Sequence, residues 1–281
     1  MTYSSKLIQC SFPVEHVLLV SLARPPVNAF NDDVARELQL HLETASKDPD
    51  VRCVVLTSDV EKGFTAGLDL FAAGTLSHKA ADPARTALHI RAHMDFLQRS
   101  VSSIQQCDKP VIAAVHGICF GAGLDLISAC DVRLCAAQGT VFSIKEVDIG
   151  LAADIGSLQR LPRVCSNASL LTELALTARN FGADEAVQLG LVSRVVQGGP
   201  ERVREEALKL ASVIASKSPV ATMSTKHLLN YSREHTVQEG LQYTQAWNMG
   251  MVQANDVQNA IEGFTKKKPP VFEPLSVKSK L

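Results

Sequence analysis

Apolar runs alternate with helical patterns along the first half of the chain. Residues 16–23, 51–57 and 110–117 are nearly continuous apolar runs with many β-branched residues, which is typical of buried strands. Between the first two runs, residues 31–48 repeat their apolar positions every three to four residues and begin with acidic residues, which predicts a helix. A long amphipathic segment at 84–106 predicts another helix. Buried strands that alternate with helices predict a parallel sheet covered on both faces.

The pattern changes after residue 154, where helical periodicity dominates. Further strands are expected near 131–135, 140–144 and 191–196. No linker rich in Pro, Gly or Ser separates the two halves, and no internal repeat is present. The sequence therefore predicts an N-terminal α/β core that continues into helices, which dock on the core or on another subunit. The expected helical segments are 155–176, 183–189, 200–216, 219–233, 236–253 and 256–265.

Composition limits the classes of function. The chain has 281 residues, 46% of them hydrophobic and 20% charged, which fits a soluble globular protein of one or two domains. A net charge of −1 gives no general electrostatic basis for binding nucleic acid or an anionic membrane. No apolar run approaches the roughly 18 to 20 residues that a membrane span requires. The seven cysteines are odd in number and form no CxxC pair, so we expect reduced core residues in an intracellular protein and no metal site.

Two glycine-containing loops are expected to expose backbone N–H groups to a ligand. Residues 63–70 follow the second expected strand, and residues 116–126 lie between the third strand and a helix. Small residues let backbone N–H groups approach a ligand, and a helix N-terminus adds partial positive charge. One N–H from each loop would form an oxyanion hole for a carbonyl that becomes an enolate. Ordinary turn chemistry is the alternative for each loop, and neither has the spacing of a dinucleotide or phosphate loop.

Acidic residues stand among apolar ones beside these loops. The stretch KEVDIGLAAD carries Glu146, Asp148 and Asp154, and Asp125 lies in the glycine-rich helix start. Clustered carboxylates in an apolar pocket cannot all ionise together, which raises at least one pKa and suits an acid/base pair. Alternatives remain open: Asp154 as a helix N-cap, Asp125 as an acid favoured in a first turn, and Asp148 as a structural or surface residue.

The order of these motifs resembles that of the crotonase (enoyl-CoA hydratase/isomerase) superfamily. The motifs are ARPPVNAFN, FTAGLDL, KPVIAAVHGICFGAGLDLISACDVRLC, FSIKEVDIGLAADIGSLQRLPR and NDVQNAIEGFTKKKPPVF, and the likeness covers about residues 13–273. The resemblance implies an α/β fold, a crotonase-type spiral of ββα units with a C-terminal helical trimerisation region. It implies a core over 1–200, a helical C-terminal region over 201–275 and a tail over 276–281. It also implies a homo-oligomer, a trimer or a hexamer.

The resemblance assigns site residues by position. An acyl-CoA thioester is the implied substrate, with no separate cofactor and no metal. The amides of Leu68 and Ala122 would bind the thioester oxygen; many members have Gly at the second position, and a backbone donor tolerates Ala. We expect Asp69 to brace its loop more than to act on substrate. The implied substrate and CoA contacts are Asn28, Ala29, Ala66, Gly67, Asp69 and Leu70.

The acids narrow the implied reaction. Asp125, Glu146 and Asp154 together resemble the set of the Δ3,5-Δ2,4-dienoyl-CoA isomerases of fatty-acid β-oxidation, and Asp154 stands where hydratases generally carry glycine. The resemblance implies that Glu146 acts near C2 and Asp154 near C6 of a dienolate, with Asp125 tuning their protonation. The alternatives are an enoyl-CoA hydratase, a Δ3,Δ2-enoyl-CoA isomerase, and a non-catalytic relative that binds acyl-CoA or RNA.

The last three residues are a candidate targeting signal. Ser279-Lys280-Leu281 is the tripeptide of peroxisomal proteins, so we expect an import receptor as a partner and a peroxisome or glycosome-like organelle as the location. The alternative is a chance C-terminus, since the same three letters recur at residues 5–7.

Overall fold

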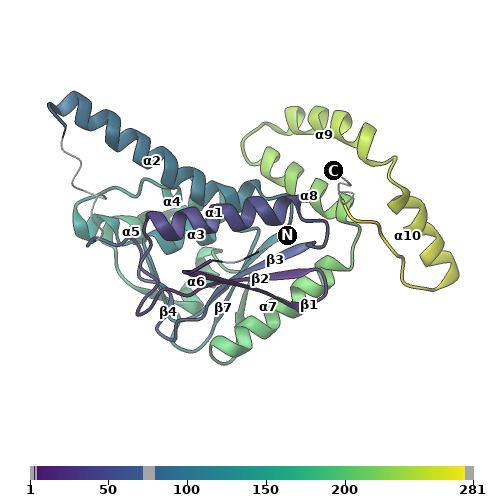
Figure 1. The fold of residues 1–281 in the computed structure, drawn as a ribbon, viewed down its shortest axis with the longest axis horizontal. Helices are drawn as coiled ribbons and strands as arrows, with labels where there is room; N and C mark the ends of the chain where they lie inside the picture. The colour runs from purple at the N-terminus through teal and green to yellow at the C-terminus, as the bar shows by residue number, and fades with distance from the viewer. Residues whose placement is uncertain (1–2, 4, 72–79, 276–281) are drawn as a thin grey trace.

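The computed structural model describes residues 3, 5–71 and 80–275 and contains two sheets (Figure 1). The larger has the strand order β1-β2-β3-β5-β7-β10. Its strands from β2 to β10 pair in parallel, as the continuous apolar runs predict, and only the β1–β2 pair is antiparallel. The bounds are β1 Ile8–Val14, β2 Val17–Leu22, β3 Cys53–Ser58, β5 Val111–Val115, β7 Val132–Ala136 and β10 Arg194–Val196.

A smaller sheet follows the larger one strand by strand. Short strands β4, β6 and β8 come after β3, β5 and β7, pair in parallel with one another, and are closed by the antiparallel β9. The expected repetition of two strands and a connection is confirmed, and it brings the two glycine loops side by side. The bounds are β4 Gly63–Thr65, β6 Ile118–Phe120, β8 Val141–Ser143 and β9 Phe181–Gly182.

Helices cover both faces of the larger sheet. On one face, alternate strand residues pack against α1 (Asp32–Lys47), α2 (Pro83–Gln106) and α3 (Ala122–Ala129). On the other face lies α7 (Pro200–Ala215), whose buried Val203, Ala207, Ala211 and Ala215 recur every fourth residue. This small-residue stripe packs α7 directly on the strands. The expected division at residue 200 assigns α7 to the C-terminal region, yet the helix shares a core with the sheet.

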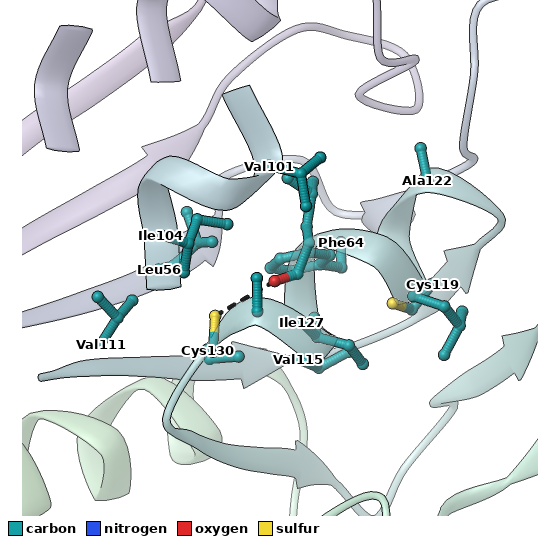
Figure 2. Packing of buried hydrophobic residues seen from close by; sticks show 14 of the residues in the cluster. Leu56, Phe64, Val101, Ile104, Val111, Val115, Cys119, Ala122, Ile127 and Cys130 are labelled. Atoms are coloured by element: carbon teal, nitrogen blue, oxygen red, sulfur yellow. Dashed lines mark hydrogen bonds between the residues drawn. The ribbon is translucent and has the colours of Figure 1, made fainter. Parts of the chain in front are cut away.

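A tightly packed cluster of apolar side chains lies against the glycine loops (Figure 2). Phe64 from β4, Val101 and Ile104 from α2, and Ile127 from α3 are almost fully buried together. Ala122, at the start of α3, belongs to the same cluster. The first residue of this helix is therefore fixed by core packing. All seven cysteines are free and five are buried, as expected of reduced core residues.

The later helices divide into two groups: α4 to α6 pack on the core, and α8 to α10 extend past the sheet. Expected segment 155–176 is two helices, because residues 165–167 interrupt it and the side chain of Asn167 caps the second by accepting from the N–H of Leu170. Helices α8, α9 and α10 extend past the sheet, on the side away from the projecting end of α2 (Figure 1). The bounds are α4 Ser157–Val164, α5 Ala168–Thr177, α6 Ala183–Leu189, α8 Pro219–Ser232, α9 Val237–Met251 and α10 Asn255–Lys266.

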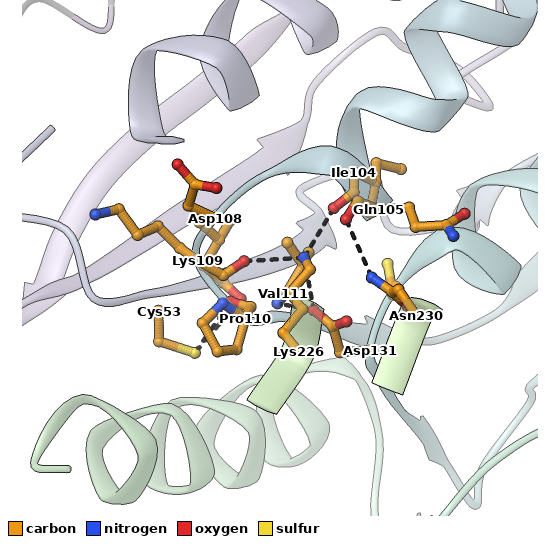
Figure 3. Close-up of polar contacts among 12 residues, drawn as sticks. Cys53, Ile104, Gln105, Asp108, Lys109, Pro110, Val111, Asp131, Lys226 and Asn230 are labelled. Carbon is orange, nitrogen blue, oxygen red and sulfur yellow. Dashed lines mark hydrogen bonds and ion pairs between the residues drawn. The ribbon is translucent and has the colours of Figure 1, made fainter. Parts of the chain in front are cut away.

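A buried lysine ties α8 to the core (Figure 3). Lys226 Nζ lies 2.8 Å from Asp131 Oδ2 and donates to the carbonyl oxygens of Ile104 (3.1 Å) and Lys109 (3.0 Å). The Lys226 side chain is only 5% exposed, so its charge is satisfied by these protein groups. Within the described ranges, no helix is long and apolar enough to cross a membrane, and no group of three or more His, Cys, Asp or Glu side chains is arranged to hold a metal ion.

Candidate active site

An apolar cavity of about 350 Å³ opens where the two glycine loops meet. The turn after β4, the helix α2, the start of α3, the 3₁₀ turn η1 (Glu146–Ile149) and the segment before α4 surround it. Most of the wall is aliphatic, and two carboxylates face it. The lining residues are Ala66, Gly67, Leu68, Leu70, Ile90, His93, Met94, Leu97, Gly121, Ala122, Lys145, Glu146, Ile149, Leu151, Asp154 and Ile155.

Gly67 allows the first loop to approach the second. Its φ is +92°, and a β-carbon on it would lie 2.8 Å from the carbonyl oxygen of Phe120 and 3.6 Å from the nitrogen of Ala122. Any side chain here would strain the backbone and push the loops apart. Glycine is therefore required for the two loops to lie in contact.

The amides of Leu68 and Ala122 are free to bind a ligand. In a parallel bridge to Phe30, Gly67 O accepts from Phe30 N at 2.7 Å and Asp69 N donates to Phe30 O at 2.8 Å. Because successive N–H groups alternate in direction, that of Leu68 points the other way. Ala122 is the first residue of α3, where amides lack a helical acceptor. In the described part of the chain, no hydrogen bond uses either N–H.

Glu146 lies beside this pair of amides. Its Oε1 is 3.1 Å from the point where a β-carbon on Gly121 would stand, and Gly121 directly precedes Ala122. Its Oε2 is buried and has no hydrogen-bond partner among the described residues. Burial, reinforced by the charge of Asp154, raises the pKa of Glu146. A carboxylate in this position is a candidate base for a carbon next to the bound carbonyl.

Asp154 faces the same cavity from the segment between η1 and α4 and is half-buried. Burial raises its pKa. The alternative of a helix N-cap is wrong, because α4 begins at Ser157 with Gly156 as its N-cap and no side-chain cap. Asp154 also borders a second, polar cavity of about 320 Å³. The residue therefore lies at the boundary between apolar and polar surroundings.

Asp125 stands behind the cavity and does not line it. It is completely buried in the first turn of α3, the turn in which the sequence places it. Its Oδ1 accepts from the N–H of Ser157 at 2.5 Å and from the Ser157 hydroxyl at 2.7 Å, while Oδ2 has no partner within the described part of the chain. Burial first, and then the charges of Glu146 and Asp154, raise the pKa of Asp125 to about 7. It is thus coupled to the other two acids through charge.

Asp69 of the first loop and Asp148 of η1 have structural contacts. Asp69 Oδ2 accepts from Arg24 at 2.7 Å and Oδ1 accepts from the N–H of Phe71, so Asp69 braces its loop as expected. Asp148 is exposed and pairs with Lys145 at 3.0 Å, which confirms a surface role.

Residues expected to contact CoA divide into two groups. Ala66, Gly67 and Leu70 line the cavity. Asn28 is buried, donating to Ser58 Oγ and Phe64 O and accepting from Arg24 N, so its amide is used within the loop. Neither Asn28 nor Ala29 lines the cavity, and their contact with CoA stays a prediction.

Three side chains of the site have no signal in the sequence pattern. His93 lines the cavity from α2 and pairs with Asp32 at 2.8 Å. Gln98 donates to the carbonyl oxygen of Asp154 at 2.7 Å, and Ser157 holds Asp125. The period of α2 indicates a buried face, yet it does not distinguish a face on a cavity from one on the core.

Comparisons with known proteins agree with this geometry. The family described as "Enoyl-CoA hydratase/isomerase" matches residues 14–274. A mitochondrial Delta(3,5)-Delta(2,4)-dienoyl-CoA isomerase of Homo sapiens is 47% identical over 95% of this chain and 81% of its own length. A peroxisomal enzyme of the same name from Arabidopsis thaliana is 40% identical over 89% of each chain. The solved structure of an enoyl-CoA hydratase from Bacillus anthracis has a TM-score of 0.84 at 27% identity, covering 95% of this chain and 99% of that one.

Proposed function

The chain belongs to the enoyl-CoA hydratase/isomerase family, and from this premise we propose that it converts 3,5-dienoyl-CoA to 2,4-dienoyl-CoA. One observation carries the proposal: two separate carboxylates with raised pKa values, Glu146 and Asp154, face one apolar cavity beside two free amides. A proton that moves from C2 to C6 needs an acceptor at one end of the diene and a donor at the other. Relatives with high identity carry the name of this activity.

The proposed reaction has two proton transfers. The Glu146 carboxylate takes a proton from C2. The electrons of the C2–H bond form a C1=C2 double bond, the carbonyl electrons move to the thioester oxygen, and conjugation with the diene spreads the negative charge to C6. The N–H groups of Leu68 and Ala122 stabilise that oxyanion, each worth about 100- to 1,000-fold in rate. Asp154 in its acid form then protonates C6, which leaves double bonds at C2 and C4. Glu146 is assigned to C2 because it lies beside Gly121 and hence beside the oxyanion amides.

The mutual influence of the acids supports these opposite roles. A base must be ionised while the acid keeps its proton, although both groups are carboxyls. The charges of Glu146 and Asp154 raise the pKa of Asp125, and the charge of Asp154 raises the pKa of Glu146. Groups coupled in this way lose their protons one after another and titrate as a unit. A partly ionised cluster supplies one base and one acid at the same pH.

Apolar walls suit a dienolate intermediate. Leu68, Ile149, Leu151 and Ile155 line the cavity between and around the two acids. Water at C2, C4 or C6 would protonate the intermediate without control, and aliphatic side chains keep it out. A hydratase instead needs two carboxylates on one water, and among the described residues that line the cavity Asp125 is not found beside Glu146.

The proposal is tested with the purified protein and a 3,5-dienoyl-CoA. We expect the ultraviolet absorbance of a conjugated 2,4-diene to rise. Asp154→Asn should lower kcat by about 100- to 10,000-fold, the usual contribution of a general acid, while binding of a saturated acyl-CoA is retained. Asp148→Asn is the matched control and should keep full activity. Hydration of a 2-enoyl-CoA without diene formation would instead identify a hydratase.

We infer peroxisomal import from the tripeptide Ser279-Lys280-Leu281, which lies outside the described residues. The Arabidopsis relative is named peroxisomal, whereas the human relative is named mitochondrial. Imaging an N-terminally tagged protein decides between the two organelles. Replacing Leu281 by Asp should leave the protein in the cytosol if the tripeptide is the signal, and unchanged mitochondrial staining would overturn the assignment.

We infer a homo-oligomer from the C-terminal helices. Their large apolar side chains point to solvent in the single chain, with Val237 82% exposed on α9 and Phe264 89% exposed on α10. A surface of this kind is typical of a subunit interface. Light scattering during gel filtration should give three or six times the mass of the chain, and a monomer mass would contradict the inference.

A further inference from the structure

The segment that carries Asp154 has little structure of its own. Residues 152–155 lie between η1 and α4 in neither helix nor strand. Among the described residues, they donate and accept no backbone–backbone hydrogen bond. Glu146 differs, because its carbonyl oxygen accepts from the N–H of Leu151 and closes the 3₁₀ turn that contains it. The position of Asp154 is therefore set from outside its segment.

Two side chains from outside hold this segment. Gln98 of α2 donates from Nε2 to the carbonyl oxygen of Asp154 at 2.7 Å. Ser157, three residues after Asp154, donates both its N–H and its hydroxyl to the same oxygen of Asp125. Gly156, which lies between Asp154 and Ser157 in the sequence, has a φ of +145°, a backbone conformation that favours glycine. The segment is thus fixed at Asp154 itself and at the first residue of α4.

The Ser157 contact reaches directly to the oxyanion hole. Asp125 belongs to the first turn of α3, the same turn whose first amide is that of Ala122. Ser157 and Asp125 are both 0% exposed, so water does not compete for their hydrogen bonds. One buried contact therefore fixes Asp154 relative to the amide that would bind the thioester oxygen of the substrate. Among the hydrogen bonds of the described residues, Gln98 and Ser157 make none to Glu146.

We propose that Gln98 and Ser157 are positioning residues that hold Asp154 at the distance of C6 and so serve the second proton transfer. This inference rests on the proposed isomerisation. A displacement of about 1 Å at a reacting group costs about 100-fold in rate, so loss of either contact should slow protonation at C6 and leave removal of the C2 proton intact. The contacts determine how far along the acyl chain the enzyme acts.

The experiment compares two variants with two matched controls. Ser157→Ala removes the hydroxyl donor, and Gln98→Leu removes the amide donor from an exposed position that tolerates change. Ser128→Ala removes another buried hydroxyl of α3, one that donates to the carbonyl oxygen of Asp125 and not to its carboxylate. Gln159→Leu changes an exposed glutamine that borders the same polar cavity as Gln98. Both controls should match wild type.

Isotope effects separate positioning from general damage. Each test variant should lower kcat by about 10- to 100-fold, with unchanged binding of a saturated acyl-CoA. When C6 protonation becomes the slower step, the dienolate returns to C2. The kinetic isotope effect of deuterium at C2 then becomes smaller. The solvent isotope effect of D₂O becomes larger, because the deuteron that Asp154 delivers to C6 comes from the solvent. Loosening of the whole site would slow both steps and leave the two effects in their wild-type ratio.

Each outcome decides the inference. Reduced kcat with the shifted isotope effects supports it. Wild-type kcat in both test variants, or reduced kcat with an unshifted ratio, overturns it. If Ser157→Ala does not fold, Gln98→Leu alone decides the matter. A wild-type protein that forms no diene is a separate result, because it rejects the proposed isomerisation itself.

Discussion

Replacing Asp125 by asparagine should remove a large part of the pH dependence of the protein's stability. The wild-type carboxyl is completely buried, with Oδ1 accepting two bonds from Ser157 and Oδ2 without a partner. Burial raises its pKa from 3.8 to about 7. Between these values the folded protein keeps a proton that the unfolded chain has lost. Stability from this group is therefore fully present below pH 3.8 and is lost as the pH rises towards 7.

The size of the effect follows from the two pKa values. One unit of pKa difference corresponds to about 1.4 kcal/mol, so the interval from 3.8 to about 7 amounts to about 4 kcal/mol in all. About 3 kcal/mol of this falls between pH 5 and pH 8. Asparagine still offers an oxygen to Ser157, while its buried Nδ2 donor costs about 1–3 kcal/mol. That cost is the same at every pH, so it cancels when the two pH values are compared.

Urea unfolding at pH 5 and pH 8, at one ionic strength and one protein concentration, measures this difference. The free energy of unfolding of wild type should fall relative to Asp125→Asn by about 3 kcal/mol between the two pH values. Asp148→Asn is the control, since that carboxylate is exposed and paired with Lys145, and its profile should run parallel to wild type. If Asp125→Asn also runs parallel to wild type, the buried carboxyl does not hold its proton as described.

Two further changes test the core and the first loop. Lys226→Met leaves Asp131 without its buried partner and should lower the free energy of unfolding in urea by about 3–5 kcal/mol, whereas Lys209→Met on the surface should change it by less than about 1 kcal/mol. A smaller loss at Lys226 would show that the ion pair does not anchor α8. Gly67→Ala should displace the N–H of Leu68 and lower kcat for diene formation by about 100- to 1,000-fold, with the unfolding transition retained; unchanged kcat would remove that N–H from the oxyanion hole.

Elements with a long regular pattern could be predicted from the sequence. The short strands β7, β8 and β10 lie near the expected 131–135, 140–144 and 191–196, whereas β1, β4, β6 and β9 were not expected. The runs at 16–23, 51–57 and 110–117 are strands β2, β3 and β5, because continuous apolar character fits strands covered on both faces. Strand β1 pairs only with β2 at the edge of the sheet, and most of its residues are exposed or half-buried, so its pattern is weak. The three-residue strands β4 and β6 are too short to show an alternation of apolar and polar residues, and they are strands because they pair with each other across the smaller sheet.

The chemistry of the site could be predicted further than its geometry. The resemblance to the family assigned roles to Glu146, Asp154 and the amides of Leu68 and Ala122, and the structure has all four residues around one cavity. The positions of the acids relative to the wall depend on contacts between distant residues. Ser157 and Asp125 are 32 positions apart in the sequence, and Gln98 and Asp154 are 56 apart, so the local sequence pattern cannot predict either contact.

Unequal burial gives three identical functional groups different tasks. Asp154 is half-buried at a polar boundary, Glu146 is half-buried beside the oxyanion amides with its Oε2 enclosed, and Asp125 is wholly enclosed. Coupling between charges is reciprocal: the charge of Asp154 raises the pKa of Asp125, so an ionised Asp125 in turn raises the pKa of Asp154. The negative charge behind the cavity thereby extends the pH range in which Asp154 keeps the proton that C6 requires. Asparagine at 125 carries no such charge, and the alkaline limit of kcat should then move to lower pH, although asparagine keeps the contact with Ser157.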